Sequence, residues 1–310
     1  MSIVEINNLT KDYEVGFLRK RKVRALDDLS LTVDSGQIFG FLGANGAGKT
    51  TTLKLLMRLI FPTSGSARIL GSDIQNVRMH ERIGYLPENP YFYDYLTARE
   101  FLEYCAEIFG YAAVDRKKRA ADLLARVNLD EKSWDKQLRK FSKGMLQRVG
   151  LAQSLINDPE IVFLDEPMSG LDPVGRREVR DLIASLREDG KTVFMCSHIL
   201  SDIEVLCDRV AILKRGRLAQ VGHLDELRQR TEDPNRMEIL AAGADPAALR
   251  HLANADVPAT PRGLRIEIAS ENEIETALEA LRKAGGKVVS IQPVKQSLEE
   301  LFMDGSPSSN

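Results

Sequence analysis

The stretch Gly43 to Thr50 reads GANGAGKT and lies between an apolar run and a helical pattern. It contains a glycine, four further residues, Gly-Lys and a final threonine, which is the pattern of a phosphate-binding loop. The preceding residues 37–42 (QIFGFL) read as a buried strand, and residues 51–57 (TTLKLLM) read as a helix. Because the strand, the loop and the helix come in the order that a phosphate site requires, this segment predicts a nucleotide-binding fold.

The overall composition is that of a folded protein whose 310 residues suffice for a large domain and a small one. Its 43 basic and 45 acidic residues give a net charge of −2, so we expect no nucleic-acid partner. No apolar run approaches the roughly 18 residues of a membrane span, and the first residues lack a signal-peptide pattern. Cys105, Cys196 and Cys207 show no metal-ligand spacing, which favours buried thiols in a cytoplasmic protein.

The residue types in the phosphate loop each have a chemical role. Its glycines let backbone N–H groups turn toward the β- and γ-phosphates of ATP, and the next helix adds its positive dipole end. Lys49 would hold the outer phosphates, and the Thr50 hydroxyl would bind Mg²⁺. The expected nucleotide contacts in this segment are Gly43, Ala44, Asn45, Gly46, Ala47, Gly48, Lys49, Thr50 and Thr51.

Two acidic residues end a second apolar run, at residues 161–166 (IVFLDE). A continuous apolar run is typical of a parallel strand buried on both faces. We expect Asp165 to support Mg²⁺ and Glu166 to face the water that attacks the γ-phosphate. The alternative is that the acidic pair only caps the next turn.

Together with five further elements, these two segments resemble the nucleotide-binding subunit of an ABC transporter. Each element is weak alone, but their order and spacing over residues 1–222 are specific. The five are an adenine-stacking aromatic at Tyr13, a Q-loop at Glu88, a signature at residues 141–145 (FSKGM), a D-loop at residues 169–173 (SGLDP) and a switch histidine at His198.

The resemblance implies that part of each nucleotide site comes from a second copy. In the family two subunits pack head to tail, and the signature of one covers the γ-phosphate bound by the other. Ser142 and Gly144 would then contact the ATP of the partner, and Asp172 would bridge the two copies. From the residues alone, Ser142 is an ordinary helix N-cap, whose free N–H groups already form an anion site.

The resemblance also implies the catalytic residues, which are Glu166 for the attacking water, with His198 and Lys49 at the γ-phosphate. A lone histidine at a strand end is by default a structural residue, so His198 depends on this resemblance. The metal site would comprise Thr50, Asp165 and Glu88, the last replacing the family's usual glutamine. This replacement, and Lys143 and Met145 in the signature, resemble the exporter branch whose ATPase is separate from its membrane subunits.

An aromatic loop at residues 89–97 (NPYFYDYLT) follows the Q-loop position. Thr97 and Glu100 then have capping-box spacing, which predicts a helix from Ala98. In the family, the groove between the helical lobe and the core receives a short helix of a polytopic membrane subunit, and exposed aromatics suit such an interface. The alternative is that these aromatics belong to the core. The partners implied are this membrane subunit and a second ATP-binding subunit on the cytoplasmic face of the cell membrane. A homodimer is expected, and a heterodimer stays open as the alternative.

We therefore expect an α/β fold: a P-loop NTPase core of the ABC type over residues 1–230, with an antiparallel β lobe and a helical lobe at about residues 90–145. The basic run 19–24 would be a solvated hairpin tip rather than a lipid contact. Residues 231–235 have linker composition. Residues 236–303 alternate between strand and helix periods, which predicts a small α+β accessory domain before a disordered tail at 304–310. Its expected strands are near 237–240, 264–268 and 287–291, and its expected helices are 246–252, 271–283 and 297–302.

The expected function is ATP hydrolysis, with ATP and Mg²⁺ as cofactors, coupled to export of an unidentified substrate. Two alternatives stay open. One is an ATP-switched regulator that acts on a soluble partner, against which the intact Glu166 and His198 argue. The other is the ATPase of an importer, which Glu88 and the FSKGM signature disfavour by resemblance.

Overall fold

A computed structural model describes residues 1–16, 20–224, 226–227, 232–243, 259–260, 263–268 and 273–295 of the chain. The chain forms two compact units, Met1–Leu224 and Asp225–Asn310. Both contain strands and helices, and the nucleotide motifs all belong to the first unit.

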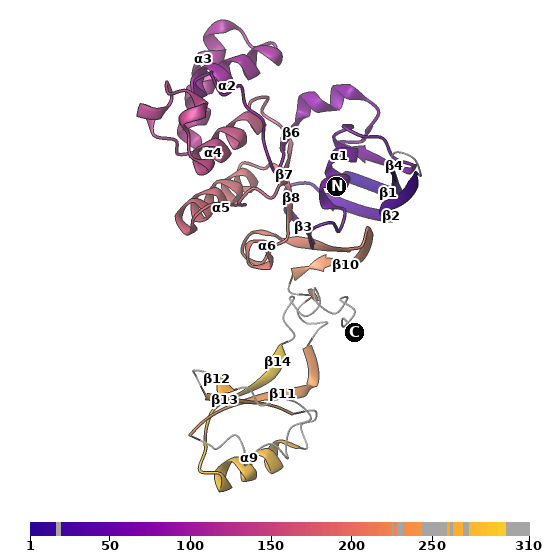
Figure 1. Ribbon diagram of the computed structural model, residues 1–310, viewed down its shortest axis with the longest axis vertical. Helices are drawn as coiled ribbons and strands as arrows, with labels where there is room; N and C mark the ends of the chain where they lie inside the picture. The colour runs from indigo at the N-terminus through magenta and orange to yellow at the C-terminus, as the bar shows by residue number, and fades with distance from the viewer. Residues whose placement is uncertain are drawn as a thin grey trace. The chain divides into compact units, whose positions relative to one another are not determined.

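A six-stranded sheet forms the centre of the first unit (Figure 1). Its strands are β3 (Ile38–Gly43), β6 (Ile83–Leu86), β7 (Ile161–Asp165), β8 (Thr192–Ser197), β9 (Arg209–Lys214) and β10 (Arg217–His223). They lie in the order β10-β9-β3-β8-β7-β6, with parallel pairing except between β9 and β10. Every residue of β3, β7 and β8 is buried, which confirms the prediction of strands covered on both faces.

Helices surround this sheet, and three of them gather into a helical lobe in Figure 1: α2, α3 and α4. The helices of the unit are α1 (Lys49–Leu56), α2 (Ala98–Ile108), α3 (Ala113–Arg126), α4 (Lys143–Ser154), α5 (Pro173–Glu188) and α6 (Leu200–Leu206), with 3₁₀ turns η1 (Val77–Arg82), η2 (Glu131–Ser133) and η3 (Leu138–Lys140). The capping box that starts α2 is confirmed, since the Thr97 hydroxyl accepts from Glu100 N and the Glu100 carboxylate accepts from Thr97 N.

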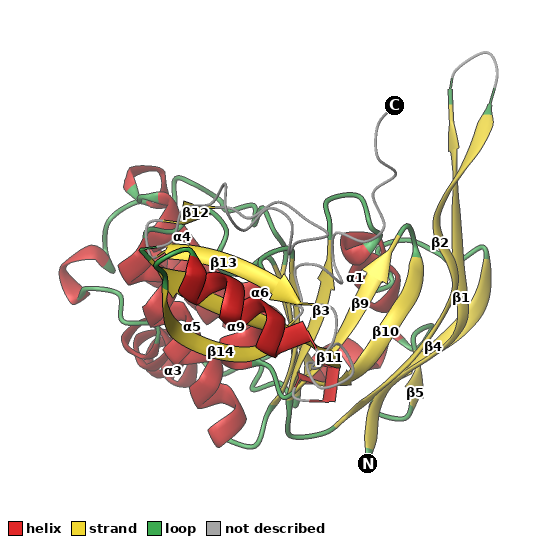
Figure 2. Cartoon of the chain, turned by 90° about the horizontal axis from the view of Figure 1, so that it is seen from below, coloured by secondary structure: helices red, strands yellow, loops and turns green. Residues whose placement is uncertain are grey.

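An antiparallel lobe completes the first unit. Its strands are β1 (Ser2–Val15), β2 (Arg21–Asp34), β4 (Ser64–Ile69) and β5 (Ser72–Asp73), in the order β2-β1-β4-β5. The β1–β2 hairpin is long and extends along one edge of the unit (Figure 2). Buried residues of both sheets, among them Leu26, Leu29, Phe39 and Phe41, share one hydrophobic core, so the lobe and the central sheet are packed together. The predicted basic run lies partly outside the described residues, and Lys20, Arg21 and Lys22 are exposed.

The second unit is a four-stranded antiparallel sheet with a helix packed on one face. Its elements are β11 (Glu232–Ala242), β12 (Ala259–Thr260), β13 (Gly263–Ile268), α9 (Ile274–Lys283) and β14 (Lys287–Lys295), and the strand order is β12-β13-β11-β14. Ala277 and Leu281 of α9 join Ile239 and Ile266 of the sheet in a small core. This confirms the predicted α+β character.

Some boundaries in the second unit differ from the sequence prediction. The linker expected at residues 231–235 is wrong from Glu232 onward, because β11 begins there and its register on β14 shifts between Glu232 and Met237. This irregularity spans Pro234, which has no N–H for the ladder. The predicted helices 246–252 and 297–302 and the tail 304–310 lie outside the described residues.

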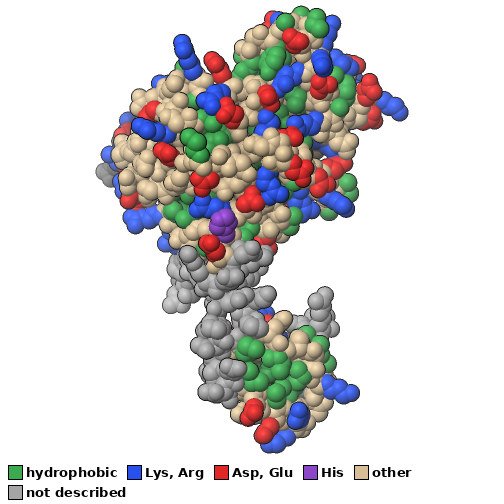
Figure 3. Space-filling view, turned by 180° about the vertical axis from the view of Figure 1, so that it is seen from behind, with side chains coloured by type: hydrophobic (Ala, Val, Ile, Leu, Met, Phe, Trp, Pro, Cys, Tyr) green, Lys and Arg blue, Asp and Glu red, His purple; other side chains and the backbone are tan. Residues whose placement is uncertain are grey.

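The surface of the first unit carries basic and acidic side chains side by side, as Figure 3 shows for one face. On the second unit the same view shows a group of hydrophobic side chains, and the exposed large apolar residues among its described residues are Val288, Val289 and Ile291 of β14. None of the helices that the structure describes has the length and apolar character to cross a membrane.

Candidate functional site

The sheet order brings the predicted site segments together at one edge. β8 lies between β3 and β7, and β6 lies on the far side of β7. Parallel strands place their carboxyl ends at the same edge of a sheet. Four segments therefore converge there: the phosphate loop after β3, His198 after β8, the Asp165–Glu166 pair at the end of β7 and Glu88 after β6.

The phosphate loop has the backbone conformation that its glycines permit. Gly48 precedes α1 with φ +112°, and a Cβ atom there would lie 2.7 Å from the carbonyl oxygen of Ala25, so only glycine fits. The loop borders a hollow of about 270 Å³ that faces the N-terminus of α1. Gly43 and Ala47 are buried beside it. The hollow is lined by Ala25, Ala44, Asn45, Gly46, Gly48, Lys49, Thr50, Thr51, Glu88 and Glu166.

Lys49 and Glu166 line this hollow, and Glu166 contacts both Lys49 and His198, although His198 itself is not part of the lining. The Nζ atom of Lys49 lies 2.6 Å from the carbonyl oxygen of Gly43 and 3.3 Å from Oε1 of Glu166. The other carboxylate oxygen, Oε2, lies 2.8 Å from Nδ1 of His198. Lys49 and Glu166 are buried, and the His198 side chain is 39% exposed. The structure therefore places His198 in contact with Glu166, beside the phosphate loop.

The position of Glu166 is fixed by its own backbone conformation and by a hydrogen bond to the neighbouring strand β8. Its φ is +51°, a left-handed conformation that is uncommon outside glycine and that clusters at functional sites. Its N–H donates to the carbonyl of Cys196 on β8 at 3.0 Å. In addition, the Gln147 amide of α4 donates to the carbonyl of Pro167 at 2.8 Å, which ties the signature helix to the residue after Glu166. The role of Gln147 escapes sequence analysis because only the fold shows that this polar residue is buried.

Asp165 is a buried carboxylate close to the Thr50 hydroxyl. Among the residues that the structure describes, no group hydrogen-bonds either of its oxygens. Burial raises the pKa of Asp165 to about 6, an increase that the nearby Thr50 hydroxyl and Lys49 oppose and that Glu166 and Glu88 reinforce. A buried carboxylate whose oxygens accept no hydrogen bond is suited to bind a cation. Nothing indicates that it caps the next turn.

Ser142, Gly144 and Asp172 line a separate hollow of about 610 Å³ between α4 and the loop before α5. The Ser142 hydroxyl caps α4 by accepting from the N–H of Met145 at 3.3 Å, and Asp172 caps α5 by accepting from the N–H of Gly175 at 2.8 Å. The Lys143 side chain extends over Gly170, so a side chain at position 170 would require Lys143 to move. The structure thus joins signature and D-loop in one surface that is distinct from the hollow at the phosphate loop.

Tyr13 does not line the phosphate-loop hollow. It lies on β1 opposite Val23 of β2, and its side chain is partly buried. The ammonium group of Lys11 lies over the ring, 5.2 Å from its centroid, while donating to the carbonyl of Phe61 at 2.7 Å. The ring is therefore held from one side by a cation.

Comparison with known proteins decides the family. A model described as ABC transporter matches residues 26–169, and one described as the C-terminal domain of DrrA1-3-like ATP-binding proteins matches residues 222–305. The uncharacterized ABC transporter ATP-binding protein sll0415 of Synechocystis sp. is 44% identical to the chain over 303 residues, which cover 97% of this chain and 84% of the relative. The chain belongs to the ABC transporter ATP-binding proteins.

Two further relatives of this ABC protein carry informative descriptions. The linearmycin resistance ATP-binding protein LnrL of Bacillus subtilis is 32% identical over 285 residues, covering 89% of this chain and 91% of LnrL. The dimeric post-hydrolysis structure of the ATP-binding cassette MJ0796 bound to ADP and Pi superposes with a TM-score of 0.66 at 28% identity, covering 71% of this chain and 98% of that one.

Membership in this family confirms the predicted fold class and the predicted ATPase activity. The first unit is the ATP-binding and ATP-hydrolysing cassette of an ABC transporter, and a DrrA-like C-terminal domain follows it. The matched range 26–169 contains the phosphate loop, the signature and the Asp165–Glu166 pair. Tyr13 and His198 lie outside that range.

Proposed function

We propose that this ABC ATPase powers export, working as a pair of copies on a separate polytopic membrane subunit at the cytoplasmic face of the membrane. The observation that carries the proposal is the position of Glu166, which is held between Lys49 and His198 at the phosphate loop. The similarity to LnrL, a resistance protein by its description, supports the outward direction.

The residues at the hollow fit Mg²⁺ together with a nucleotide. Mg²⁺ usually takes one or two protein oxygen ligands and completes its shell with phosphate oxygens and water. The carboxylate of Asp165, which is close to Thr50, and the Thr50 hydroxyl would supply such ligands, and Glu88 lines the same hollow. Bound Mg²⁺ would neutralise charge on the β- and γ-phosphates. Lys49 Nζ already binds oxygen atoms of the protein, which phosphate oxygens can replace.

Glu166 and His198 provide the chemistry that hydrolysis needs. A carboxylate in a buried site accepts a proton from, or orients, the water that attacks the γ-phosphorus atom. With its hydrogen on Nδ1, His198 donates to Oε2 of Glu166 and keeps the carboxylate aimed into the hollow. When Nε2 carries a hydrogen as well, it can donate to an oxygen of the γ-phosphate, where charge develops in the transition state.

In a single copy, the phosphate-loop hollow and the surface formed by the signature and D-loop are two separate hollows. The hollow with Ser142, Gly144 and Asp172 offers the N-terminus of α4 and the cation of Lys143, with no acidic residue in the first turn of that helix. Helix N-termini bind anions such as phosphate groups. We propose that this surface covers the γ-phosphate bound by a second copy, as in a head-to-tail dimer.

An aromatic surface at the start of the helical lobe is the proposed dock for the membrane subunit. Tyr91, Tyr93, Tyr95 and Tyr104 are exposed, and Tyr93 contacts the other three rings at centroid distances of 5.9–6.4 Å. Only Phe92 of this loop is buried, against Phe101. Exposed tyrosines with packed rings are typical of protein interfaces rather than of a solvated surface.

The test is co-purification of tagged Glu166→Gln with Mg²⁺ and ATP from solubilised native membranes, followed by mass spectrometry of what is bound. A stoichiometric polytopic membrane protein is the expected partner, and Tyr91→Ser/Tyr95→Ser in the same background should lose it. Val114→Ser, which removes an exposed apolar side chain from α3 of the same lobe, is the surface control that should retain it. Recovery of soluble partners alone would overturn the exporter proposal and favour an ATP-switched regulator.

A further inference from the structure

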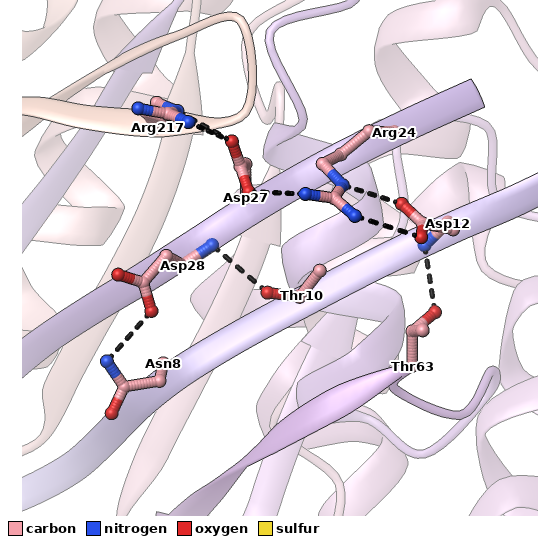
Figure 4. A network of polar contacts seen from close by, with 8 residues as sticks. All are labelled: Asn8, Thr10, Asp12, Arg24, Asp27, Asp28, Thr63 and Arg217. Atoms are coloured by element: carbon pink, nitrogen blue, oxygen red, sulfur yellow. Dashed lines mark hydrogen bonds and ion pairs between the residues drawn. The ribbon is translucent and has the colours of Figure 1, made fainter. Parts of the chain in front are cut away.

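A chain of ion pairs crosses the hairpin that carries Tyr13 (Figure 4). Arg24 on β2 donates through Nε and a terminal nitrogen to the two carboxylate oxygens of Asp12 on β1, at 2.8 and 3.2 Å. Its remaining nitrogen donates to Asp27 at 3.0 Å. Arg217 on β10 donates to the second oxygen of Asp27 at 2.7 Å. The two arginines and two carboxylates thus connect three strands, β1, β2 and β10.

The same chain of contacts reaches the phosphate loop through the backbone. The N–H of Asp27 donates to the carbonyl of Gly216, and the N–H of Gly216 donates to the carbonyl of Ala47, at 2.9 and 2.8 Å. Gly216 has φ +81° and its Cα approaches Ala25 so closely that a Cβ would clash. The turn between β9 and β10 therefore links the hairpin to the phosphate loop.

The hairpin needs such a link near Tyr13, because its own ladder is irregular there. The register between β1 and β2 shifts on both sides of Lys11, immediately before Asp12 pairs with Arg24 and Tyr13 pairs with Val23. A backbone ladder with register shifts leaves the position of the following residues less well fixed. The Arg24–Asp12 fork lies at the first regular pair after the shifts.

From this geometry we infer that Arg24 is a positioning residue for ATP, which holds Tyr13 in register with the phosphate loop through Asp12 and Asp27. The inference rests on the proposed contact between Tyr13 and adenine. The two carboxylates are only 12% and 17% exposed, and the planar guanidinium binds Asp12 through two nitrogens and Asp27 through the third, a geometry that the single nitrogen of a lysine does not reproduce. Tyr13 belongs to the antiparallel sheet, whereas the phosphate loop follows β3 of the central sheet. The distance between the adenine contact and the phosphate contacts therefore depends on the connection through Arg24 and Asp27.

The experiment compares two ligands in Arg24→Gln: ATP, and inorganic tripolyphosphate, which lacks the base. The dissociation constant of ATP should rise about tenfold, within the range that base–aromatic stacking provides, while that of tripolyphosphate stays within about twofold. Arg21→Gln is the matched control, since Arg21 has no ion pair among the described residues and lies on the same strand. Arg24→Lys should restore only part of the ATP affinity.

A double-mutant cycle with Tyr13→Ala separates this inference from the proposed function. If Arg24 acts through Tyr13, the double variant Tyr13→Ala/Arg24→Gln binds ATP no more weakly than Tyr13→Ala. Additive losses, or an equal loss for ATP and tripolyphosphate in Arg24→Gln, would overturn the inference. Unchanged ATP affinity in Tyr13→Ala would instead refute the proposed adenine contact.

Discussion

Replacing Asp165 with asparagine should stabilise the nucleotide-free protein at neutral pH. Asp165 is 1% exposed, and no described group hydrogen-bonds its carboxylate. Burial raises its pKa from the ordinary 3.8 to about 6, so the folded protein pays for an ionised group that the unfolded chain hydrates freely. The asparagine amide occupies the same space without that charge.

The size of the effect follows from the pKa. A rise from 3.8 to about 6 corresponds to about 3 kcal/mol in the free energy of unfolding at pH values above 6. Because the pKa is raised, this destabilisation is complete above pH 6 and vanishes as the pH falls through the ordinary value. About half of it remains at pH 5. A buried amide without partners cancels part of the gain, so we expect about 1–3 kcal/mol.

The assay is denaturant unfolding of the wild type and Asp165→Asn without nucleotide, between pH 5 and pH 7.5. The variant should be the more stable protein at pH 7.5, and its advantage should shrink toward pH 5. Asp158→Asn is a control of opposite sign, since Lys191 lowers the pKa of Asp158 and that pair stabilises the fold at neutral pH. A variant that is less stable at pH 7.5, or a difference independent of pH, would show that the ionised Asp165 carboxylate does not destabilise the folded protein.

Three further substitutions test separate parts of the account. Lys49→Ala should weaken ATP binding by more than about 100-fold, because removal of a buried cation from a phosphate site costs several kcal/mol. Lys54→Ala, on the exposed face of α1, is the control and should not change ATP binding. Retained micromolar binding of Lys49→Ala in a fluorescent-nucleotide titration would reject the phosphate-loop role. Ser142→Arg should bind ATP as before but lose turnover, and loss of both would mean that Ser142 serves its own copy or the fold. Leu281→Ala, in the core of the second unit, should lower the free energy of unfolding of that unit by about 2–5 kcal/mol. In calorimetry, the melting temperature of the ATPase unit should stay unchanged. A lower melting temperature of the ATPase unit would show that the two stabilities are coupled.

Much of the first unit was predictable because its signals are local. The apolar strand before GANGAGKT, the run that ends in Asp165 and the Thr97 capping box each depend on neighbouring residues, and each lies where the sequence places it. The convergence of the site residues was predictable only through the family pattern. Periodicity alone does not show that β8 lies between β3 and β7 and so carries His198 to Glu166.

The features that could not be predicted from the sequence depend on packing between distant segments. The left-handed backbone of Glu166, the buried Gln147 amide and the Arg24 network arise between segments that are far apart in the chain. The linker prediction at residues 231–235 failed for a similar reason. Polar residues and Pro234 indicate a loop locally, whereas pairing with β14 extends the strand to Glu232 across a register shift.

The most direct test of the central claim is the steady-state ATPase rate of Glu166→Gln with Mg²⁺, measured together with its molar mass by light scattering. We expect that ATP still binds, that turnover falls at least about 100-fold with loss of the group that activates water, and that ATP doubles the molar mass. Turnover at the wild-type rate would contradict the role of Glu166 at the hollow between Lys49 and His198.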